Sequence, residues 1–326
     1  CMLLPVGVWG YEYKTLTITQ NYGSNSFSLY YVIADNDNTQ IEVTSVAGVP
    51  VQNTAPALTP GTPTTIILNK GQVLQVLATS QTQELSGSVI KSVSNSAGKC
   101  FPIAVFSGSS RTGISIPASC SSGGDFSMQQ NFPATAWGKR YLTAPTSFST
   151  AAFNTTANPF ATNTFRIAVS DPLTVVKKNG VVMTGIVNNH YYQYSSNTAD
   201  IIEADQPIMM AQFTSGGTCL GGPSGAVGDP EMIYISPVEQ GIDKVGFYRN
   251  TAESITINYV TLVVPTNGVA SLKIYDNNAL VAPDYTYAHP QNGNPSLKGV
   301  DYTVVIKRWT SAQQQVRVEC DSVFTG

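Results

Sequence analysis

The chain has 326 residues, which is enough for two or three domains of ordinary size. Only 11% of the residues are charged, against roughly 25% in a typical soluble protein, and Ser, Thr, Asn, Gln and Gly take their place, as in many secreted β proteins. The net charge of −3 excludes the strongly basic face of a nucleic-acid-binding protein, and no apolar run approaches the roughly 18 residues that span a bilayer.

Strand-like segments follow one another along the whole chain. Runs such as TLTITQ, FSLYYVIA and TQIEVTS alternate or stay apolar for five to eight residues, and they are rich in β-branched and aromatic residues. Clusters such as NYGSNS and DNDN lie between them and have the composition of turns. No long segment has helical spacing and caps. We therefore predict an all-β protein.

One opening sequence recurs along the chain. LPVGVWGYEYKTLTI at the start and FPATAWGKRYLTAP at 132–145 share an apolar-Pro pair, a Trp-Gly step, an aromatic residue and a β-prone run. ISPVEQGIDKVGFYRN at 235–250 is a weaker third copy, with Gly241 in place of the Trp-Gly step. Repeats of about a hundred residues are domains rather than solenoid coils.

The repeat predicts three related β-sandwich-like units in tandem, at residues 1–130, 131–234 and 235–326. The third unit is expected to be truncated at its last strand, because the final VFTG stops where the second copy continues into MMAQF. We therefore expect the sequence to be a segment of a longer chain. The alternative arrangement is a closed, propeller-like packing of the three units.

Five cysteines limit the possible disulfides: Cys1, Cys100, Cys120, Cys219 and Cys320. Cys100 and Cys120 bracket the Gly/Ser-rich segment SGSSRTG, and we predict a disulfide between them. In the chain-entropy model a loop of about twenty residues makes such a bond worth roughly 3 kcal/mol. The alternative is two unrelated thiols. No Cys-x-x-Cys spacing occurs, so cysteine-bound metal is not expected.

The segment ADNDNT is rich in oxygen ligands. Asp35 and Asp37 alternate with Asn36 and Asn38, so we name these two aspartates as a candidate calcium site. The segment lacks the glycine and the distal glutamate of an EF-hand loop. Asx turns at a strand junction are the simpler explanation, and we expect no other cofactor.

Catalytic constellations are not found in the sequence. His190 and His289 are far from any Gly-x-Ser-x-Gly elbow, which does not occur here. The acidic residues fall at equivalent strand ends of different repeats, whereas a glycosidase needs two carboxylates facing each other. We predict that the protein is not an enzyme, with a carbohydrate-active hydrolase as a remote alternative.

Two tyrosines are candidates for ligand binding. Tyr192 and Tyr194 alternate in HYYQY and should share one face of a strand. If exposed, this face could stack on sugar rings or on a partner; the alternative is a ladder of packed tyrosines across neighbouring strands. We also assign ligand binding to Arg111 in SGSSRTG, because long loops on a rigid β frame often carry recognition.

Several motifs together resemble a known family. These are LSGSVIKSV…CFPIAVFSGSSRT at 85–112, GDFSMQQNFPATAWGKRYLTAP at 124–145 and GDPEMIYISPVEQ at 228–240. In this order they resemble the amino-terminal domain of the IgGFc-binding protein family, and the resemblance covers nearly the whole chain. The family usually has a preceding segment and a further strand after VFTG. An Asp-His pair common in the family appears here as Asp125-Phe126.

The resemblance implies a non-catalytic extracellular module for adhesion or scaffolding, secreted or at the cell surface. Bacterial members occur in large surface proteins of Bacteroidota, often with gliding-motility or type IX secretion sorting modules, and animal members occur in mucus proteins. Glycans and cell-surface or mucin-like proteins are the expected partners. The alternative is self-association, in which the chain is a subunit of a surface filament or layer completed by strand pairing between chains.

Overall fold

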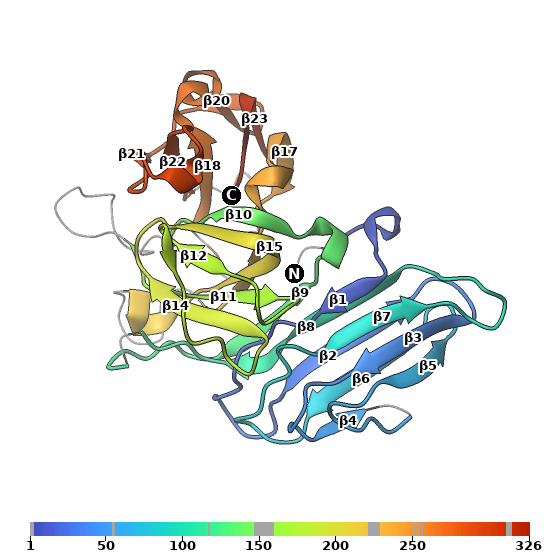
Figure 1. Cartoon of the computed structure of the whole chain (residues 1–326). Coiled ribbons are helices and arrows are strands. Elements are labelled where there is room, and N and C mark those ends of the chain that lie inside the picture. Colours follow the sequence, from blue (N-terminus) through green and yellow to red (C-terminus); the bar gives the residue numbers. More distant parts are fainter. Residues whose placement is uncertain are drawn as a thin grey trace.

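The computed structural model describes residues 3–53, 56–116, 118–146, 160–220, 229–250, 252, 255, 257–310 and 315–326. Strands and short 3-10 helices make up the secondary structure of these residues, which confirms the all-β prediction (Figure 1). No helix in this part of the chain is long and apolar enough to cross a membrane.

The first unit (β1–β9) consists of two antiparallel sheets. One sheet has the order β1-β7-β3-β5, with bounds Glu12–Lys14, Val89–Val93, Thr39–Thr44 and Thr64–Leu68. The other has the order β4-β6-β2-β8-β9, with bounds Val51–Asn53, Val73–Ala78, Ser28–Ala34, Ile103–Thr112 and Asp125–Gln130. Tyr30, Ile41 and Val105 belong to the core of this unit. Residues two apart on a strand share a face, so one face of each strand can be turned to this core.

The second unit (β10–β16) is a single seven-stranded sheet around the long strand β15 (Ile201–Phe213). The first half of β15 pairs with β10 and β12, and the second half pairs with β11 and β16. β13 extends the sheet beyond β12, and β14 extends it beyond β11. The bounds of β10 to β14 are Gly138–Leu142, Asn163–Val169, Val176–Lys178, Val181–Val182 and Tyr191–Ser196, and those of β16 are Met232–Ile235.

The third unit (β17–β23) again has two sheets. The order β17-β23-β19-β20 has bounds Ile242–Tyr248, Gln315–Phe324, Lys273–Asp276 and Ala279–Val281. The order β18-β22-β21 has bounds Asn258–Pro265, Tyr302–Trp309 and Tyr285–Ala288. Three short 3-10 helices lie in connections between strands, namely η3 (Gly217–Leu220), η5 (Thr266–Ser271) and η6 (Pro295–Leu297).

The three units repeat one strand plan. In the first unit β7 belongs to one sheet and β8 to the other. In the second unit the first half of β15 corresponds to β7, and its second half corresponds to β8. β23 pairs with β17 and β19 in the same way and reaches β18 through one bridge. The sequence repeat therefore has a counterpart in the strand order. The residue bounds of the units stay a prediction.

A 3-10 turn opens each unit. η1 (Val6–Val8), η2 (Ala134–Ala136) and η4 (Val238–Gln240) each follow a proline whose φ is −64°, −62° or −68°. The proline ring holds φ near −65° and so favours this entry. In the first two units the Trp9 and Trp137 indoles donate to backbone carbonyls five residues earlier, at 3.1 and 3.2 Å.

The Trp-Gly step is tied to a buried tyrosine. The Gly10 N–H donates to the Tyr13 hydroxyl at 2.7 Å, and the Gly138 N–H donates to the Tyr141 hydroxyl at 3.2 Å. The third opening has Val245 at the position of the tyrosine. The weaker sequence match of the third copy thus corresponds to the loss of a specific hydrogen bond.

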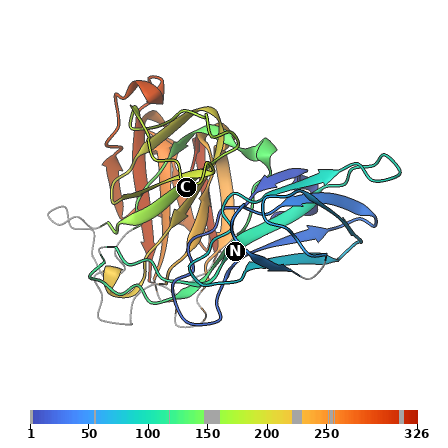
Figure 2. The ribbon, with the colours of Figure 1, turned by 60° about the horizontal axis from the view of Figure 1, so that its bottom comes forward.

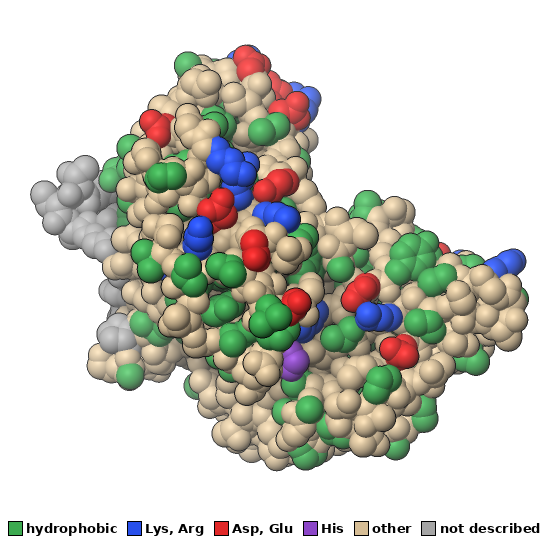
Figure 3. Space-filling model, in the orientation of Figure 1, with side chains coloured by type: hydrophobic (Ala, Val, Ile, Leu, Met, Phe, Trp, Pro, Cys, Tyr) green, Lys and Arg blue, Asp and Glu red, His purple; other side chains and the backbone are tan. Residues whose placement is uncertain are grey.

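The second unit lies between the first and the third (Figures 1 and 2), so the closed arrangement about a threefold does not describe this chain. One apolar cluster joins the first two units and contains Leu16 and Phe213. Another joins the second and third units and contains Leu142 and Val304. The face of the molecule seen in Figure 3 shows few charged side chains, with both signs interspersed.

Candidate functional site

Of the two candidate tyrosines, Tyr192 is buried and Tyr194 is half-buried. They share one face of β14, as predicted, but this face belongs to the core of the second unit. Tyr192 is 7% exposed, and Tyr194 stacks on Phe165 with ring centroids 4.9 Å apart. Burial raises the pKa of Tyr194 well above its usual value. The prediction of an exposed tyrosine face for ligands is therefore wrong, and the packed ladder is what the structure shows.

Asp35 and Asp37 bind the turn between β5 and β6. The Lys70 ammonium lies 3.3 Å from an Asp35 oxygen, and the Lys70 backbone N–H donates to Asp37 at 3.1 Å. Among the described residues, no group of three or more His, Cys, Asp or Glu is arranged to hold a metal ion. These contacts are those of a strand junction, and calcium at Asp35 and Asp37 stays a prediction.

The disulfide joins Cys120 to Cys219, with a Cα–Cα distance of 5.1 Å. The predicted Cys100–Cys120 bond is therefore wrong. Cys100 is an exposed free thiol whose sulfur lies 3.3 Å from the Ser92 hydroxyl. Cys120 instead lies in a segment that packs against the second unit. Cys320 is free and buried, and Cys1 is outside the described residues.

Arg111 is exposed near the end of strand β8, rather than in a loop as the sequence analysis expected. Its guanidinium carbon is 4.8 Å from the centroid of the Tyr22 ring, and Tyr22 is 41% exposed. We call this pair, with the backbone around Gly113 and Gly124, the Arg111 surface. A guanidinium stacked on an aromatic ring still presents planar N–H donors that can bind a partner.

Two amide side chains fix the Arg111 surface. The Gln20 side chain accepts the Arg111 N–H at 2.7 Å and donates to the Tyr22 carbonyl at 2.8 Å. The Asn21 side chain accepts the Gly113 N–H at 2.9 Å and donates to its carbonyl at 2.8 Å. These four bonds hold both loops in one arrangement before any ligand arrives.

A glycine allows the tyrosine to lie against the neighbouring loop. A Cβ atom on Gly124 would lie 2.3 Å from a ring atom of Tyr22, which is shorter than any real contact. Any larger residue at this position would displace the ring. Gly124 therefore positions the aromatic half of the Arg111 surface.

The disulfide segment links this surface to the second unit. The Ser121 N–H donates to the Thr218 hydroxyl at 2.7 Å, and the Thr218 N–H donates to the Ser121 carbonyl at 2.9 Å. These bonds flank the Cys120–Cys219 disulfide. The loops around Arg111 are thus held by two units at once.

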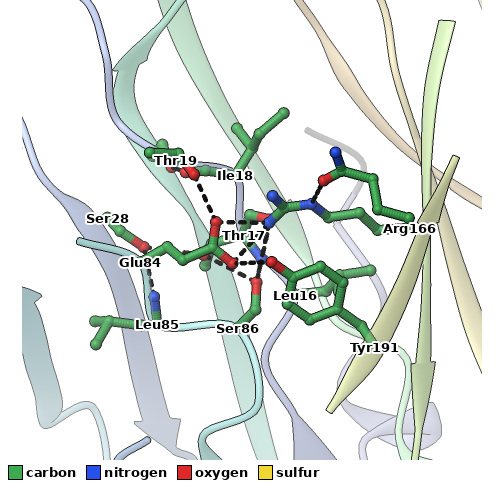
Figure 4. A network of polar contacts seen from close by, with 12 residues as sticks. Leu16, Thr17, Ile18, Thr19, Ser28, Glu84, Leu85, Ser86, Arg166 and Tyr191 are labelled. Carbon is green, nitrogen blue, oxygen red and sulfur yellow. Dashed lines mark hydrogen bonds and ion pairs between the residues drawn. The ribbon is translucent and has the colours of Figure 1, made fainter. Parts of the chain in front are cut away.

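A buried polar network lies at the same junction (Figure 4). One Arg166 nitrogen donates to both Glu84 oxygens, at 2.8 and 2.9 Å, and to the Thr17 carbonyl at 2.6 Å. The hydroxyls of Tyr191 and Thr19 each donate to Glu84 at 2.8 Å. Arg166 belongs to the second unit and Glu84 to the first, so the network ties the two units together.

The sequence analysis did not identify this network. Its one signal is an arginine inside the apolar run FRIAV, which forms a fully buried strand. A charged residue is rarely buried unless it has a partner. The pattern could therefore have shown that Arg166 has a partner, but not that the partner is Glu84.

Both histidines and one lysine are structural. Burial lowers the pKa of Lys14 to about 8, and its ammonium donates to the Val169 carbonyl at 2.6 Å. Burial, with a smaller contribution from Lys14, lowers the pKa of His190. Burial lowers the pKa of His289 to about 4. These groups lie within and between the units, apart from the Arg111 surface.

Two acidic residues, Glu203 and Glu239, lie at the junction of the second and third units. The Ser296 hydroxyl donates to Glu203 at 2.9 Å, and Glu239 lies 3.5 Å from the Arg140 guanidinium. Each carboxylate has a structural partner. These contacts account for both acids without a catalytic role.

Comparison with known proteins gives one match. A family model described as IgGFc binding protein matches residues 1–326, the whole chain. No curated protein and no solved structure matches the chain. The match spans all three units, with their repeated openings and the loops around Arg111. The chain belongs to the IgGFc binding protein family.

Proposed function

We propose that the chain is a non-catalytic extracellular adhesion module that recognises a glycan or a cell-surface protein through the Arg111 surface. The observation that carries this proposal is the Arg111 guanidinium held over Tyr22 at 4.8 Å at the exposed end of β8. Family membership supports an extracellular binding role. The module would belong to a larger secreted or surface protein, as the family resemblance implies.

The chemistry of the pair favours a ligand with an acidic or carbonyl-rich group. Arginine presents planar donors that match a carboxylate, and tyrosine offers a flat apolar face. Arginine and tyrosine are also enriched among the residues that dominate binding energy at protein interfaces. An acidic sugar or an acidic protein side chain beside an apolar surface would satisfy both.

Binding is tested by surface plasmon resonance on the immobilised chain. The probes are an IgG Fc fragment, a sialylated mucin-type glycoprotein and the same glycoprotein after enzymatic removal of its sugars, each with calcium and with a chelator. We expect one probe to bind, and Arg111→Ala to weaken that binding about tenfold or more, as for a hot-spot residue.

The matched control is Lys99→Ala, which removes one exposed positive charge near the start of β8, far along the strand from Arg111. It is expected to leave the affinity unchanged. Equal binding by Arg111→Ala and the unmodified chain, or no binding by any probe, would contradict the proposal. Loss of binding with the chelator alone, matched by Asp35→Asn, would place the site at Asp35 and Asp37 instead.

A further inference from the structure

The segment between β8 and β9, residues 113–124, borders the Arg111 surface. Thr112 of β8 pairs with Asp125 of β9, so the segment leaves and returns at the same place. A Cβ atom on Gly113 would lie 2.2 Å from the Gly123 carbonyl oxygen, so the two ends of the segment are in close backbone contact. Gly124 follows and lies against the Tyr22 ring. The path of this segment therefore determines where the ring can lie.

The two halves of the segment are anchored differently. In the first half, Ile114 belongs to the apolar cluster that joins the first two units, and Ile116 packs against this cluster. The second half reads ASCSSGG at 118–124 and contains no large apolar side chain. A chain of glycine and serine is flexible unless other contacts restrain it. Apolar packing therefore does not account for the fixed path of the second half.

The second half is tied to η3 of the second unit. The disulfide between Cys120 and Cys219 is the covalent tie. The Ser122 hydroxyl also accepts the Gly216 N–H at 3.0 Å, which adds to the two bonds between Ser121 and Thr218. Water competes for hydrogen bonds of an exposed residue such as Ser121. The disulfide is thus the one tie in this half that water cannot replace.

We infer that the redox state of the Cys120–Cys219 disulfide regulates binding at the Arg111 surface. In the oxidised chain, the disulfide fixes the glycines that support the Tyr22 ring. In the reduced chain, the second half of the segment is released, and a ligand must order it again, which lowers the affinity. Both cysteines act as positioning residues, because neither has to touch the ligand. This inference rests on the function proposed for the Arg111 surface.

Reduction of the bond requires a dithiol that can reach it. Cys120 is half-buried, and Ser119 and Ser121 on either side of it are exposed. One thiolate of the dithiol attacks the Cys120 sulfur, and the electron pair of the broken S–S bond leaves on the Cys219 sulfur. The second thiol then displaces Cys120 and closes the disulfide of the reductant. The dithiol loses two electrons, and both cysteines become thiols.

Amide hydrogen exchange tests the release of the surface without any ligand. The Arg111 and Gly113 N–H groups donate to the Gln20 and Asn21 side chains. After reduction with dithiothreitol, exchange of these two amides is expected to become about threefold faster or more, because the bonds open more often. Exchange in Val89–Val93 is the internal control and should not change. Unchanged exchange at Arg111 and Gly113 would overturn the inference.

Surface plasmon resonance with the probe that binds the oxidised chain tests the effect on affinity. The reduced chain is expected to bind about fivefold more weakly or less, and reoxidation should restore the affinity. The Cys120→Ser/Cys219→Ser double variant should bind as weakly and no longer respond to the reductant. Cys100→Ser removes the exposed free thiol and should keep the full response. Equal affinity of the oxidised and reduced chains would overturn the inference.

A variant that weakens the same junction elsewhere separates positioning from general stability. A Cβ atom on Gly10 would lie 2.3 Å from the Pro133 Cβ, so Gly10→Ala disturbs the junction without touching the disulfide segment. Its affinity for the probe is expected to equal that of the unmodified chain. An equal loss of affinity in Gly10→Ala would overturn the inference. If no probe binds the oxidised chain, the proposed function fails, and the exchange experiment alone decides whether the disulfide holds the surface.

Discussion

Gly10 and Gly138 lie where one unit meets the opening of the next. A Cβ atom on Gly10 would be 2.3 Å from the Pro133 Cβ, and one on Gly138 would be 2.2 Å from the Pro237 Cβ. Neither glycine has a positive φ, so the reason for glycine is space rather than backbone conformation. The Trp-Gly step that marks the sequence repeat is thus also the point where consecutive units pack.

Gly10→Ala is therefore expected to lower the free energy of unfolding. Overpacking against the rigid Pro133 ring costs about 1–3 kcal/mol. Gly7→Ala is the matched control, because no atom lies within 4 Å of a Cβ at that position. Urea unfolding followed by tryptophan fluorescence measures both. Equal stability of the two variants would contradict the packing explanation.

His289 makes the free energy of unfolding depend on pH. It is 1% exposed, and its Nδ1 accepts the Gln291 N–H at 3.2 Å, a bond that protonation would break. Burial lowers its pKa to about 4, and the Asp200 carboxylate offsets this only in part.

The sign of the effect follows from proton binding. In the unfolded chain the histidine pKa is about 6.5, so between pH 6.5 and 4 the unfolded state binds more protons than the folded state. The contribution of His289 to the free energy of unfolding is fully present above pH 6.5. It falls by up to about 3 kcal/mol as the pH drops to 4. His289→Asn keeps an acceptor near Nδ1 and cannot protonate, so its unfolding midpoint should change less over this range. An equal pH dependence of both proteins would argue against this role.

The elements show what alternation in the sequence can and cannot predict. It predicted that Tyr192 and Tyr194 share one face of a strand, because the period of a strand is two. It did not predict which face is covered. Ala168 and Met209 of the second unit belong to an apolar cluster that includes Leu16 of the first unit, while Phe165 lies in the core of the second unit itself. A continuous apolar run such as that of β11 indicates burial on both faces, but it does not show that a neighbouring unit provides the second cover.

The cysteine pairing shows the same limit. Cys100 and Cys120 are close in sequence, and that proximity favoured their pairing. Cys120 instead reaches Cys219, 99 residues further on, because its segment bonds to Thr218 of the second unit. Contacts between units are set by how whole units pack, and no local pattern encodes them.

Thiol chemistry tests the observed pairing. A peptide map without reductant is expected to contain a Cys120–Cys219 link. A thiol reagent should label the exposed Cys100 in the folded protein and Cys320 only after unfolding. Cys120→Ser is expected to lower the free energy of unfolding by about 2–5 kcal/mol, the usual effect of removing a native disulfide. Cys100→Ser serves as the control and should have little effect, and the reverse ranking would contradict the pairing.

The whole molecule is a succession of three related units, and the packing of Gly10 on Pro133 recurs as the packing of Gly138 on Pro237. The recurring openings allowed this plan to be predicted from the sequence, since a Trp-Gly step at domain spacing is a rare coincidence. The cavity of about 300 Å³ between β18 and the second unit depends on how the two units pack, so no local sequence pattern predicts it.

The rigidity of the succession depends on the contacts between units, and the Glu84–Arg166 pair is a buried ionic contact between the first two. Their side chains are 15% and 5% exposed. Glu84→Gln leaves the guanidinium buried without its counter-charge, which typically costs about 3–5 kcal/mol. We expect the lower end of this range, because the Thr17 carbonyl and the Gln193 side chain still accept from Arg166.

An exposed pair of the same unit provides the control. Glu12 and Lys91 lie 3.2 Å apart with side chains 53% and 44% exposed, so Glu12→Gln should change stability by less than about 1 kcal/mol. Urea unfolding of both variants, together with Arg166→Met and the Glu84→Gln/Arg166→Met double variant, gives the coupling energy of the buried pair. The double variant should be more stable than Glu84→Gln alone, because it removes the unpaired buried charge. If Glu84→Gln and Glu12→Gln are equally stable, the network does not hold the two units together, and the apolar cluster around Leu16 must do so.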